Sequence, residues 1–248
     1  MTPPSQRRRG VVTGAASGIG NAVASRMRRE GVEVLAVDID RDGLSHFEED
    51  GCEILEADIT NPEARAKVAD WAEGANYLVN SAGVSHIGTV YSTTPADFDR
   101  LFRVNVRGTY LCMAAAVRVM AQQKSGIILN MASIAATAGL ADRFAYSMTK
   151  GAVLSMTLSA AKDLLAYNIR VNCISPARVH TPFVDDYVAK NYPGRESEMM
   201  QVLSASQPIG RMGTPEEVAP MALYLCSPAA SFITGADMPL DGGFQNLR

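Results

Sequence analysis

The sequence predicts an α/β fold in which helices cover both faces of a doubly wound, mostly parallel sheet. Short apolar runs alternate with longer helix-like segments along the 248 residues, and this alternation requires right-handed crossovers between parallel strands. A chain of this length with 47% hydrophobic residues can bury one large core. No linker, repeat or low-complexity tract divides it. We therefore expect a single domain over residues 1–248.

Strands are expected where a few apolar residues stand together between turn-forming residues. Six such runs occur, at 11–13, 32–37, 52–55, 77–79, 126–129 and 170–174. Helices are expected where apolar residues recur at helical spacing, over 21–29, 64–71, 98–120 and 146–167. A further helix should begin after Thr214, because a capping threonine, a proline and two glutamates follow one another there.

The segment 180–210 departs from this alternation. Three prolines and a glycine interrupt it, and two methionines stand among charged residues. Because it follows a strand, it is expected to lie above the carboxyl edge of the sheet, where ligands of open α/β folds bind. We interpret it as a mobile helical lid over a substrate. The alternative is a surface segment without a role.

Composition argues against several classes of partner and site. A net charge of -3 provides no basic face for nucleic acid or anionic lipid, and no run approaches the roughly 20 apolar residues of a membrane-spanning helix. The four cysteines form no CxxC pair, so neither a metal site nor a disulfide framework is indicated. Residues after Gly10 lack the apolar stretch of a signal peptide. We expect a cytoplasmic protein that binds a small molecule.

A glycine-rich turn, TGAASGIG at residues 13–20, stands between the first predicted strand and the first predicted helix. Its three glycines permit a tight turn and close approach of the backbone to a dinucleotide pyrophosphate, which the helix N-terminus then faces. Outside this strand-to-helix context, the same glycines would indicate only a packing turn.

Asp38 ends the second predicted strand, where a carboxylate can accept hydrogen bonds from both hydroxyls of an adenosine ribose. A 2′-phosphate would be repelled there. Neither the glycine turn nor Ile39 supplies the arginine or lysine that usually receives such a phosphate. The sequence therefore predicts NAD as cofactor.

Tyr146 and Lys150 stand four residues apart, so on a helix they share one face. Removing a hydride from a carbinol carbon requires a base that takes the hydroxyl proton. The pKa of tyrosine is ordinarily about 10, and a nearby cation lowers it. We expect Lys150 to supply that cation and to reach the nicotinamide ribose. Ser133, at the end of the fifth strand, should hydrogen-bond the substrate oxygen, although a Tyr-x-x-x-Lys pair alone is usually an ordinary helix surface.

Taken together, these motifs resemble the short-chain dehydrogenase/reductase superfamily over nearly the whole chain. The resemblance rests on TGxxxGIG at 13–20, NSAG at 80–83, YSMTK at 146–150, PARVHT at 176–181 and DGG at 241–243, with Asn105 and Ser133 in family order. It implies a Rossmann-like fold and oxidation of a secondary alcohol. Two departures stand out: Ala177 replaces a usual glycine, so the backbone there need not adopt positive φ, and Ser81 replaces a usual asparagine.

The resemblance also implies roles for individual residues. Asn105 would hold a water that links the lysine to solvent, Asp58 and Ile59 would flank the adenine, and Val179 and Thr181 would hold the nicotinamide carboxamide. The expected catalytic residues are Asn105, Ser133, Tyr146 and Lys150. The expected cofactor contacts are Gly14, Ser17, Gly18, Ile19, Gly20, Asp38, Ile39, Asp58, Ile59, Asn80, Ala82, Gly83, Tyr146, Lys150, Pro176, Val179 and Thr181.

For the substrate, the expected contacts are Ser133, Arg143, Tyr146 and Arg178. Arg143 lies three residues before Tyr146, and Arg178 lies on the turn beside the nicotinamide, so the two guanidinium groups are candidates to grip a carboxylate. The alternative is ordinary surface or interface pairing. His86 and His180 follow cofactor-lining motifs and are further candidates for touching substrate.

Residues 175–184 resemble bacterial dehydrogenases that oxidise the 4-hydroxyl of 2-keto-3-deoxy sugar acids, such as 2-keto-3-deoxy-L-fuconate. That is the preferred substrate class. Hydroxybutyrate dehydrogenases and similar enzymes of short hydroxy acids share the arginine three residues before the tyrosine, and other short-chain ketone reductases are a further alternative.

Two further expectations concern assembly and activity. Small residues on the helices over 98–120 and 146–167 would let helices of neighbouring subunits approach closely. The resemblance implies a homotetramer in which the end of the chain near Arg248 reaches a neighbour's pocket. A non-catalytic, dinucleotide-sensing or scaffold protein would be expected to have lost Tyr146 or Lys150, and both are present.

Overall fold

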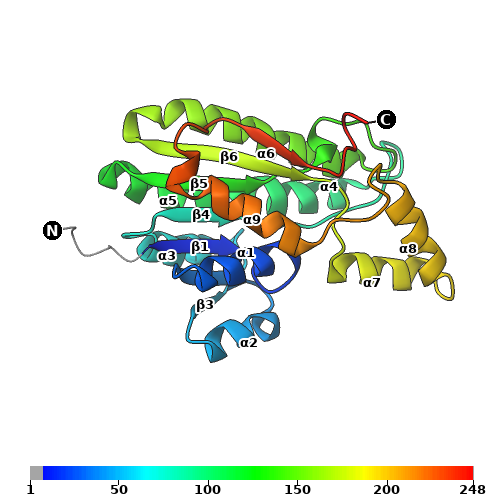
Figure 1. The fold of residues 1–248 in the computed structure, drawn as a ribbon, viewed down its shortest axis with the longest axis horizontal. Helices are drawn as coiled ribbons and strands as arrows, with labels where there is room; N and C mark the ends of the chain where they lie inside the picture. Colours follow the sequence, from blue (N-terminus) through cyan, green and yellow to red (C-terminus); the bar gives the residue numbers. More distant parts are fainter. Residues whose placement is uncertain (1–7, 248) are drawn as a thin grey trace.

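A computed structural model describes residues 8–247, and within them seven parallel strands form one sheet (Figure 1). The order is β3-β2-β1-β4-β5-β6-β7, so the direction of winding reverses between β1 and β4. The strands are β1 (Arg9–Thr13), β2 (Glu33–Asp38), β3 (Glu53–Glu56), β4 (Tyr77–Asn80), β5 (Gly126–Met131), β6 (Ile169–Pro176) and β7 (Asp237–Leu240). The predicted Rossmann-like, doubly wound class is confirmed.

The sequence predicted six of these strands, and β7 was missed. Its four residues, Asp237–Leu240, include Pro239 and lack the apolar run that marks the others. The strand pairs at the edge of the sheet with the long strand β6, whose last residues lie opposite it.

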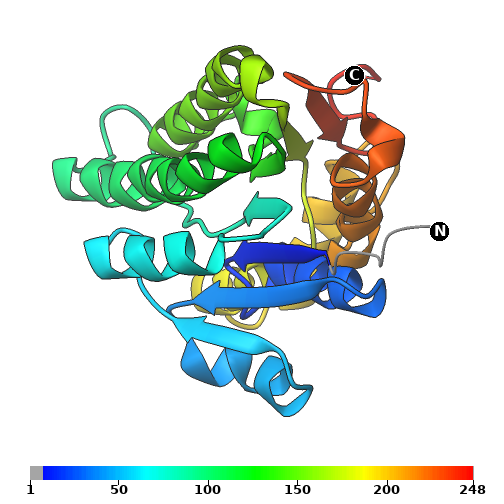
Figure 2. The same cartoon turned by 90° about the vertical axis from the view of Figure 1, so that its left-hand side faces the viewer.

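The helices are α1 (Gly18–Arg29), α2 (Arg41–Glu49), α3 (Pro62–Trp71), α4 (Pro95–Leu101), α5 (Thr109–Gln123), α6 (Phe144–Asp163), α7 (Pro182–Asn191), α8 (Glu196–Ala205) and α9 (Pro215–Leu225). Two apolar clusters show how they cover the sheet. Met27, Phe47 and Leu225 of α1, α2 and α9 pack on one face, whereas Trp71 and Met120 of α3 and α5 pack on the other, with α6 beside them (Figure 2).

The helix predicted over 98–120 is interrupted in a way that the periodicity did not indicate. Between α4 and α5, Phe102–Gly108 forms a π-helical segment, and Asn105 lies in it, almost fully buried. A widened turn of this kind is uncommon and often occurs at functional sites. Gly108 in this segment leaves room for Ile59, whose Cδ1 would lie 2.7 Å from an added Cβ.

Segment 180–210 forms α7 and α8, which lie beyond the carboxyl ends of the strands in Figure 1. They pack only loosely on the rest of the protein, because α7 buries only Val188 and α8 buries no residue.

The helix predicted after Thr214 is confirmed as α9. Its capping box joins the Thr214 and Glu217 side chains reciprocally to backbone N–H groups.

Candidate functional site

One cavity of about 740 Å³ follows the carboxyl ends of the strands at the point where the winding reverses. Segments far apart in the sequence line it, from the glycine turn after β1 to the residues after β6. The expected site residues that line it are Gly14, Ser17, Gly18, Ile19, Gly20, Asp38, Ile39, Asp58, Ile59, Ala82, Gly83, Ser133, Arg143, Tyr146, Lys150, Pro176, Arg178, Val179 and Thr181. Asn80 and Asn105 are the two expected residues that do not.

Glycine is required in the turn after β1. Gly14 has φ +71°, and a Cβ there would stand 2.6 Å from the backbone nitrogen of Ala82. At Gly20 an added Cβ would lie 2.0 Å from the carbonyl oxygen of Gly14. The turn is therefore packed against the strand beside it, and its backbone N–H groups border the cavity, an arrangement that fits a dinucleotide phosphate.

Asp38 is held in place by its neighbours. Its Oδ2 accepts a hydrogen bond from the Ala16 N–H at 3.0 Å, and its Oδ1 accepts one from the Asp40 N–H at 3.1 Å. A smaller hollow of about 250 Å³ adjoins this point, and its lining includes the carboxylates of Glu56, Asp58 and Glu63 and the ammonium of Lys67. Carboxylates therefore outnumber cations where the adenosine end of a dinucleotide would lie.

Asn80, expected to line the cofactor, does not line the cavity in this structure. Asn80 is buried, and its Nδ2 donates to Oδ1 of Asn130 at 2.9 Å inside the core. The physical reason is its position in β4, where alternate side chains point away from the cavity. Ala82 and Gly83, beyond the strand end, border the cavity instead.

Asn105 also faces protein rather than the cavity. Its Nδ2 donates to the Val84 carbonyl at 2.8 Å and to Thr149 Oγ1 at 3.0 Å, and its Oδ1 accepts from the Val84 N–H at 2.8 Å. These bonds tie the segment after β4 to α6. The side-chain amide of Asn105 thus braces these two segments, and its water-holding role stays a prediction.

Tyr146 and Lys150 lie on the first two turns of α6, and Ser133 follows β5 as the N-cap of a short 3-10 helix, Ile134–Ala136. The Lys150 Nζ lies 5.8 Å from the centre of the Tyr146 ring and donates to the Met131 carbonyl at 2.7 Å. A hydrogen bond joins Ser133 to Tyr146. The end of β5 and the start of α6 thus bring a hydroxyl, a phenol and an ammonium to one end of the cavity.

Electrostatics at this end differ from the expectation. Burial raises the pKa of Tyr146, and this outweighs the Ser133 hydrogen bond and the positive charge of Arg143, both of which lower it. Burial also lowers the pKa of Lys150 to about 8. The ammonium therefore does not lower the pKa of the phenol in the protein alone, because Lys150 is itself desolvated and turned toward the Met131 carbonyl.

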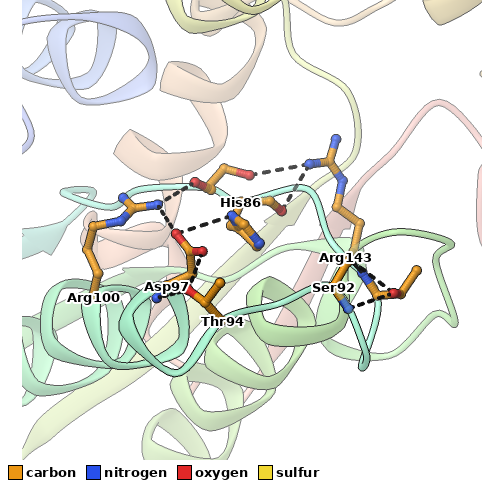
Figure 3. A network of polar contacts seen from close by, with 8 residues as sticks. His86, Ser92, Thr94, Asp97, Arg100 and Arg143 are labelled. Atoms are coloured by element: carbon orange, nitrogen blue, oxygen red, sulfur yellow. Dashed lines mark hydrogen bonds and ion pairs between the residues drawn. The ribbon is translucent and has the colours of Figure 1, made fainter.

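Arg143 is anchored where it enters α6. Gly88 exchanges backbone hydrogen bonds with both neighbours of Arg143, at 2.9 Å and 3.1 Å. The guanidinium reaches back to the loop after β4, with Nη1 3.5 Å from Ser85 Oγ and 3.4 Å from the His86 carbonyl oxygen. Figure 3 shows this reach, with Arg100 and Asp97 on the other side of the same loop.

Arg178 faces the same cavity from the turn after β6. Its Nε donates to Ser206 Oγ at 3.0 Å. The surrounding protein lowers the pKa of Arg178, and the positive charge of Arg143 lowers it further. Within residues 8–247, neither arginine forms an ion pair. Arg100, Arg103 and Lys150 also line the cavity, so its cations outnumber these two.

Neither of the histidines suggested as substrate contacts lines the cavity. His86 Nδ1 lies 3.7 Å from Asp97 Oδ1, and His180 Nε2 lies 2.7 Å from Asp185 Oδ1, so each faces an aspartate instead. The backbone at Ala177 avoids positive φ, as expected from the absence of glycine, since the described non-glycine residues with positive φ are Lys124, Asp142 and Asn168.

Sequence reasoning missed several lining residues that arrive from distant segments. Leu203 and Gln207 come from the end of α8 and the turn after it, Met212 precedes α9, and Phe244 comes from the end of the described chain. Nothing in their local sequence marks them, since only the tertiary fold brings these segments over the cavity. The expectation that the chain near Arg248 reaches a neighbour's pocket concerns a residue outside the described range. Phe244 lines the cavity of its own subunit.

The fold and the cavity together define a class, the dinucleotide-binding α/β proteins. A family model described as enoyl-(acyl carrier protein) reductase matches residues 14–245. Dehydrogenase/reductase SDR family member 6 of Aquarana catesbeiana is 37% identical over 237 residues, which cover 95% of this chain and 96% of the relative. The chain belongs to the short-chain dehydrogenase/reductase family and is an oxidoreductase that acts on CH–OH groups.

Two other similar proteins bear on substrate and cofactor. A 2-keto-3-deoxy-L-fuconate dehydrogenase of Xanthomonas campestris is 32% identical, covering 99% of this chain and 83% of the relative. A solved actinorhodin polyketide ketoreductase variant with NADPH is 28% identical with a TM-score of 0.89, covering 96% of this chain and 97% of that one. Proteins of this fold thus bind NAD or NADP, and the cavity described here fits such a dinucleotide.

Among residues 8–247, no helix combines the length and the apolar character needed to cross a membrane.

Proposed function

We propose that this protein is an NAD-dependent dehydrogenase that oxidises a secondary alcohol of a carboxylate-bearing substrate, with the 4-hydroxyl of a 2-keto-3-deoxy sugar acid as the preferred target. The observation that carries this proposal is that Arg143 and Arg178 both face the cavity that Tyr146 lines, and that neither guanidinium forms an ion pair within residues 8–247. The similarity to a 2-keto-3-deoxy-L-fuconate dehydrogenase supports the same substrate class.

In the proposed reaction, Tyr146 takes the hydroxyl proton of the substrate. Ser133, which is hydrogen-bonded to Tyr146, holds the substrate oxygen as negative charge develops on it. Bound NAD supplies the acceptor for the hydride that leaves the carbinol carbon. Lys150 holds a positive charge at the same end of the cavity and favours the phenolate once a ligand draws its ammonium away from the Met131 carbonyl. Asn105 braces the loop after β4 against α6.

The cofactor preference is proposed from Asp38. Its fixed carboxylate suits two ribose hydroxyls and repels a 2′-phosphate, and the neighbouring hollow adds three more carboxylates. The glycine turn, Asp58, Ile59 and the Ala82-Gly83 pair would hold the rest of the dinucleotide. Val179 and Thr181 would hold its carboxamide.

Replacing Asp38 by Ala should lower kcat/KM for NAD by about 10- to 100-fold, because two charge-assisted hydrogen bonds are lost. The value for NADP should fall less or rise, because the repulsion is removed. Initial rates with each cofactor measure the ratio. Asp42→Ala removes an exposed carboxylate from the first turn of α2 and serves as the control. An unchanged NAD:NADP ratio in Asp38→Ala would refute the ribose assignment.

The proposed anion site gives Arg143 and Arg178, which face one cavity without an ion-pair partner among residues 8–247, a common ligand. Burial lowers the pKa of Arg178, and the positive charge of Arg143 lowers it further. A carboxylate between them removes the repulsion and accepts hydrogen bonds from both groups. Ordinary surface pairing, the alternative for these residues, would bring protein carboxylates to them, and the ion pairs of residues 8–247 include neither arginine.

Arg143→Ala and Arg178→Ala should each raise KM for acid substrates by roughly 10- to 100-fold, since each loses a charge-assisted contact. The KM for NAD should stay close to the wild-type value. Arg195→Ala removes a cation from the same region, where it pairs with Glu198 at 2.7 Å, and is the matched control. Equal changes in the KM values for acid and for NAD would remove both arginines from the proposed anion site.

A panel of alcohols tests the proposed function directly. NADH formation is followed with 2-keto-3-deoxy-L-fuconate, with 3-hydroxybutyrate and with an uncharged secondary alcohol of similar size. We expect turnover of the acids and little turnover of the uncharged alcohol. A short hydroxy acid is the second candidate, favoured by the same arginine beside the tyrosine. Preference for the uncharged alcohol would overturn the proposal.

Other features of the site support proposals on closure and assembly. Helices α7 and α8, which bury almost none of their residues, are suited to act as a lid over the cavity. Exposed apolar side chains on and near α5 and α6, namely Phe102, Tyr110, Phe144 and Leu158, suit contact with other copies of the chain in a homotetramer. A cytoplasmic location is proposed from the four free cysteines.

A further inference from the structure

Gln207 carries an unusual buried polar group beside the cavity. The residue follows α8, lines the cavity and is only 3% exposed. Its Oε1 is buried and has no hydrogen-bond partner. A buried carbonyl oxygen left unpaired is unfavourable, and such groups are rare in native proteins. The same lining includes the apolar side chains of Val184, Leu203 and Met212.

The orientation of this amide is set by Ser206. The Ser206 hydroxyl donates to the Leu203 carbonyl at 2.6 Å and accepts from Gln207 Nε2 at 3.1 Å. Turning the amide over would place its oxygen opposite a hydroxyl whose proton is already committed to Leu203. The NH₂ group therefore faces Ser206, and the oxygen remains without a donor.

Ser206 also connects Gln207 to the proposed anion site. Its Oγ accepts a second hydrogen bond, from Arg178 Nε at 3.0 Å. One hydroxyl thus holds a guanidinium and an amide side by side, with its donor and both acceptor positions used. Arg178 retains its two Nη groups for a carboxylate, and Gln207 retains an acceptor oxygen. An acid that binds Arg178 is therefore placed next to an acceptor.

We infer that Gln207 is a specificity-determining residue whose Oε1 accepts a hydrogen bond from a second hydroxyl of the acid substrate, one other than the hydroxyl that is oxidised. The inference rests on the proposed function and deepens it, because it selects polyhydroxylated acids over short monohydroxy acids. An acid without that hydroxyl leaves the buried acceptor unpaired, and sites of this design discriminate strongly against such analogues.

The lid proposal explains how a substrate reaches a covered oxygen. Solvent reaches less than 1 Å² of this atom, so the end of α8 must shift for a ligand hydroxyl to approach. Because α8 buries none of its residues, such a shift breaks few apolar contacts. When α8 closes around a substrate that carries the second hydroxyl, this hydroxyl donates a hydrogen bond to Gln207 Oε1, which is otherwise unpaired.

Two matched acids test the inference. 2-Keto-3-deoxy-L-fuconate and 4-hydroxy-2-oxohexanoate share the carbon chain, the carboxylate and the hydroxyl at C4, and they differ in the hydroxyl at C5. We expect kcat/KM of the wild type to be roughly tenfold higher for the first acid. Gln207→Met should remove this preference, lowering kcat/KM about tenfold for 2-keto-3-deoxy-L-fuconate and leaving that for 4-hydroxy-2-oxohexanoate unchanged.

Further variants separate recognition from folding. Gln201→Met makes the same change on the exposed side of α8 and should alter neither value. Gln207→Asn keeps an amide but withdraws its oxygen by one methylene, so it should show the same selective loss. The Tm of Gln207→Met should not fall, because an apolar side chain replaces an unpaired buried acceptor.

The outcomes distinguish this inference from the proposed function. Turnover of both acids with equal kcat/KM in the wild type, or equal losses for both in Gln207→Met, would overturn the role of Gln207 and leave the proposed function standing. Turnover of neither acid by the wild type would overturn the proposed function and the inference with it.

Discussion

Tyr146→Phe should lower kcat by about 10²–10⁴-fold, the range expected when a general base is removed. The ring remains, so packing against α6 and the cavity wall is kept, and only the hydroxyl that Ser133 contacts is lost. The KM for NAD should change little. Single-turnover formation of NADH measures the hydride step directly and separates it from cofactor release.

The pH profile of the same variant adds a second check. Burial raises the pKa of Tyr146 in the protein alone, so the wild-type rate should rise with pH as the phenol loses its proton, and this dependence should vanish in Tyr146→Phe. Tyr167→Phe, which alters an exposed tyrosine just beyond α6, is the control and should retain the wild-type profile. Wild-type turnover by Tyr146→Phe would refute the mechanism.

The strands and most helices could be predicted because they depend on local patterns. The strands β1 to β6 carry short apolar runs, and α9 carries its own capping residues. The edge strand β7 has no such run, so only its pairing with β6 identifies it. The π-helical segment at Phe102–Gly108 changes the helix geometry without altering the apolar spacing enough to reveal it.

Within the candidate site, prediction succeeded for side chains near strand ends and the glycine turn, where chain position determines which residues meet. It did not indicate that the Asn80 side chain is bonded inside the core, because one step along a strand turns a side chain to the other face of the sheet. It also misjudged the electrostatic effect of Lys150, because desolvation depends on everything packed around the ammonium. Gln207 was missed because only the tertiary fold brings the turn after α8 to the cavity.

Lys150→Met should lower kcat by about 10²–10³-fold, because the positive charge that favours the phenolate is lost. The same change should make the protein more stable at pH 7. Lys150 is 8% exposed, and burial lowers its pKa from 10.5 to about 8. At 1.36 kcal/mol per pKa unit, holding the ammonium in the folded protein costs about 3 kcal/mol.

Lys150→Met removes this cost, but part of the gain in stability is offset because the Met131 carbonyl loses the hydrogen bond that it accepts from Lys150 Nζ at 2.7 Å. We therefore expect Lys150→Met to exceed the wild type by about 1–2 kcal/mol in free energy of unfolding at pH 7. Denaturant titration at fixed pH measures this difference. Lys162→Met, on an exposed position of the same helix, should leave both activity and stability near wild type.

The sign of the pH dependence follows from the lowered pKa of Lys150. Below about pH 8 the folded and unfolded chains both carry the ammonium, so the wild type bears the full cost. Between pH 8 and 10.5 the unfolded chain binds the proton and the folded chain does not, so wild-type stability rises with pH relative to the variant. The stability difference should narrow by about 1 kcal/mol between pH 7 and pH 9. The contradicting outcome is a Lys150→Met variant that is less stable than the wild type by an amount independent of pH. In that case the buried ammonium of Lys150 would stabilise the folded protein, and its chemical role would carry no cost in stability.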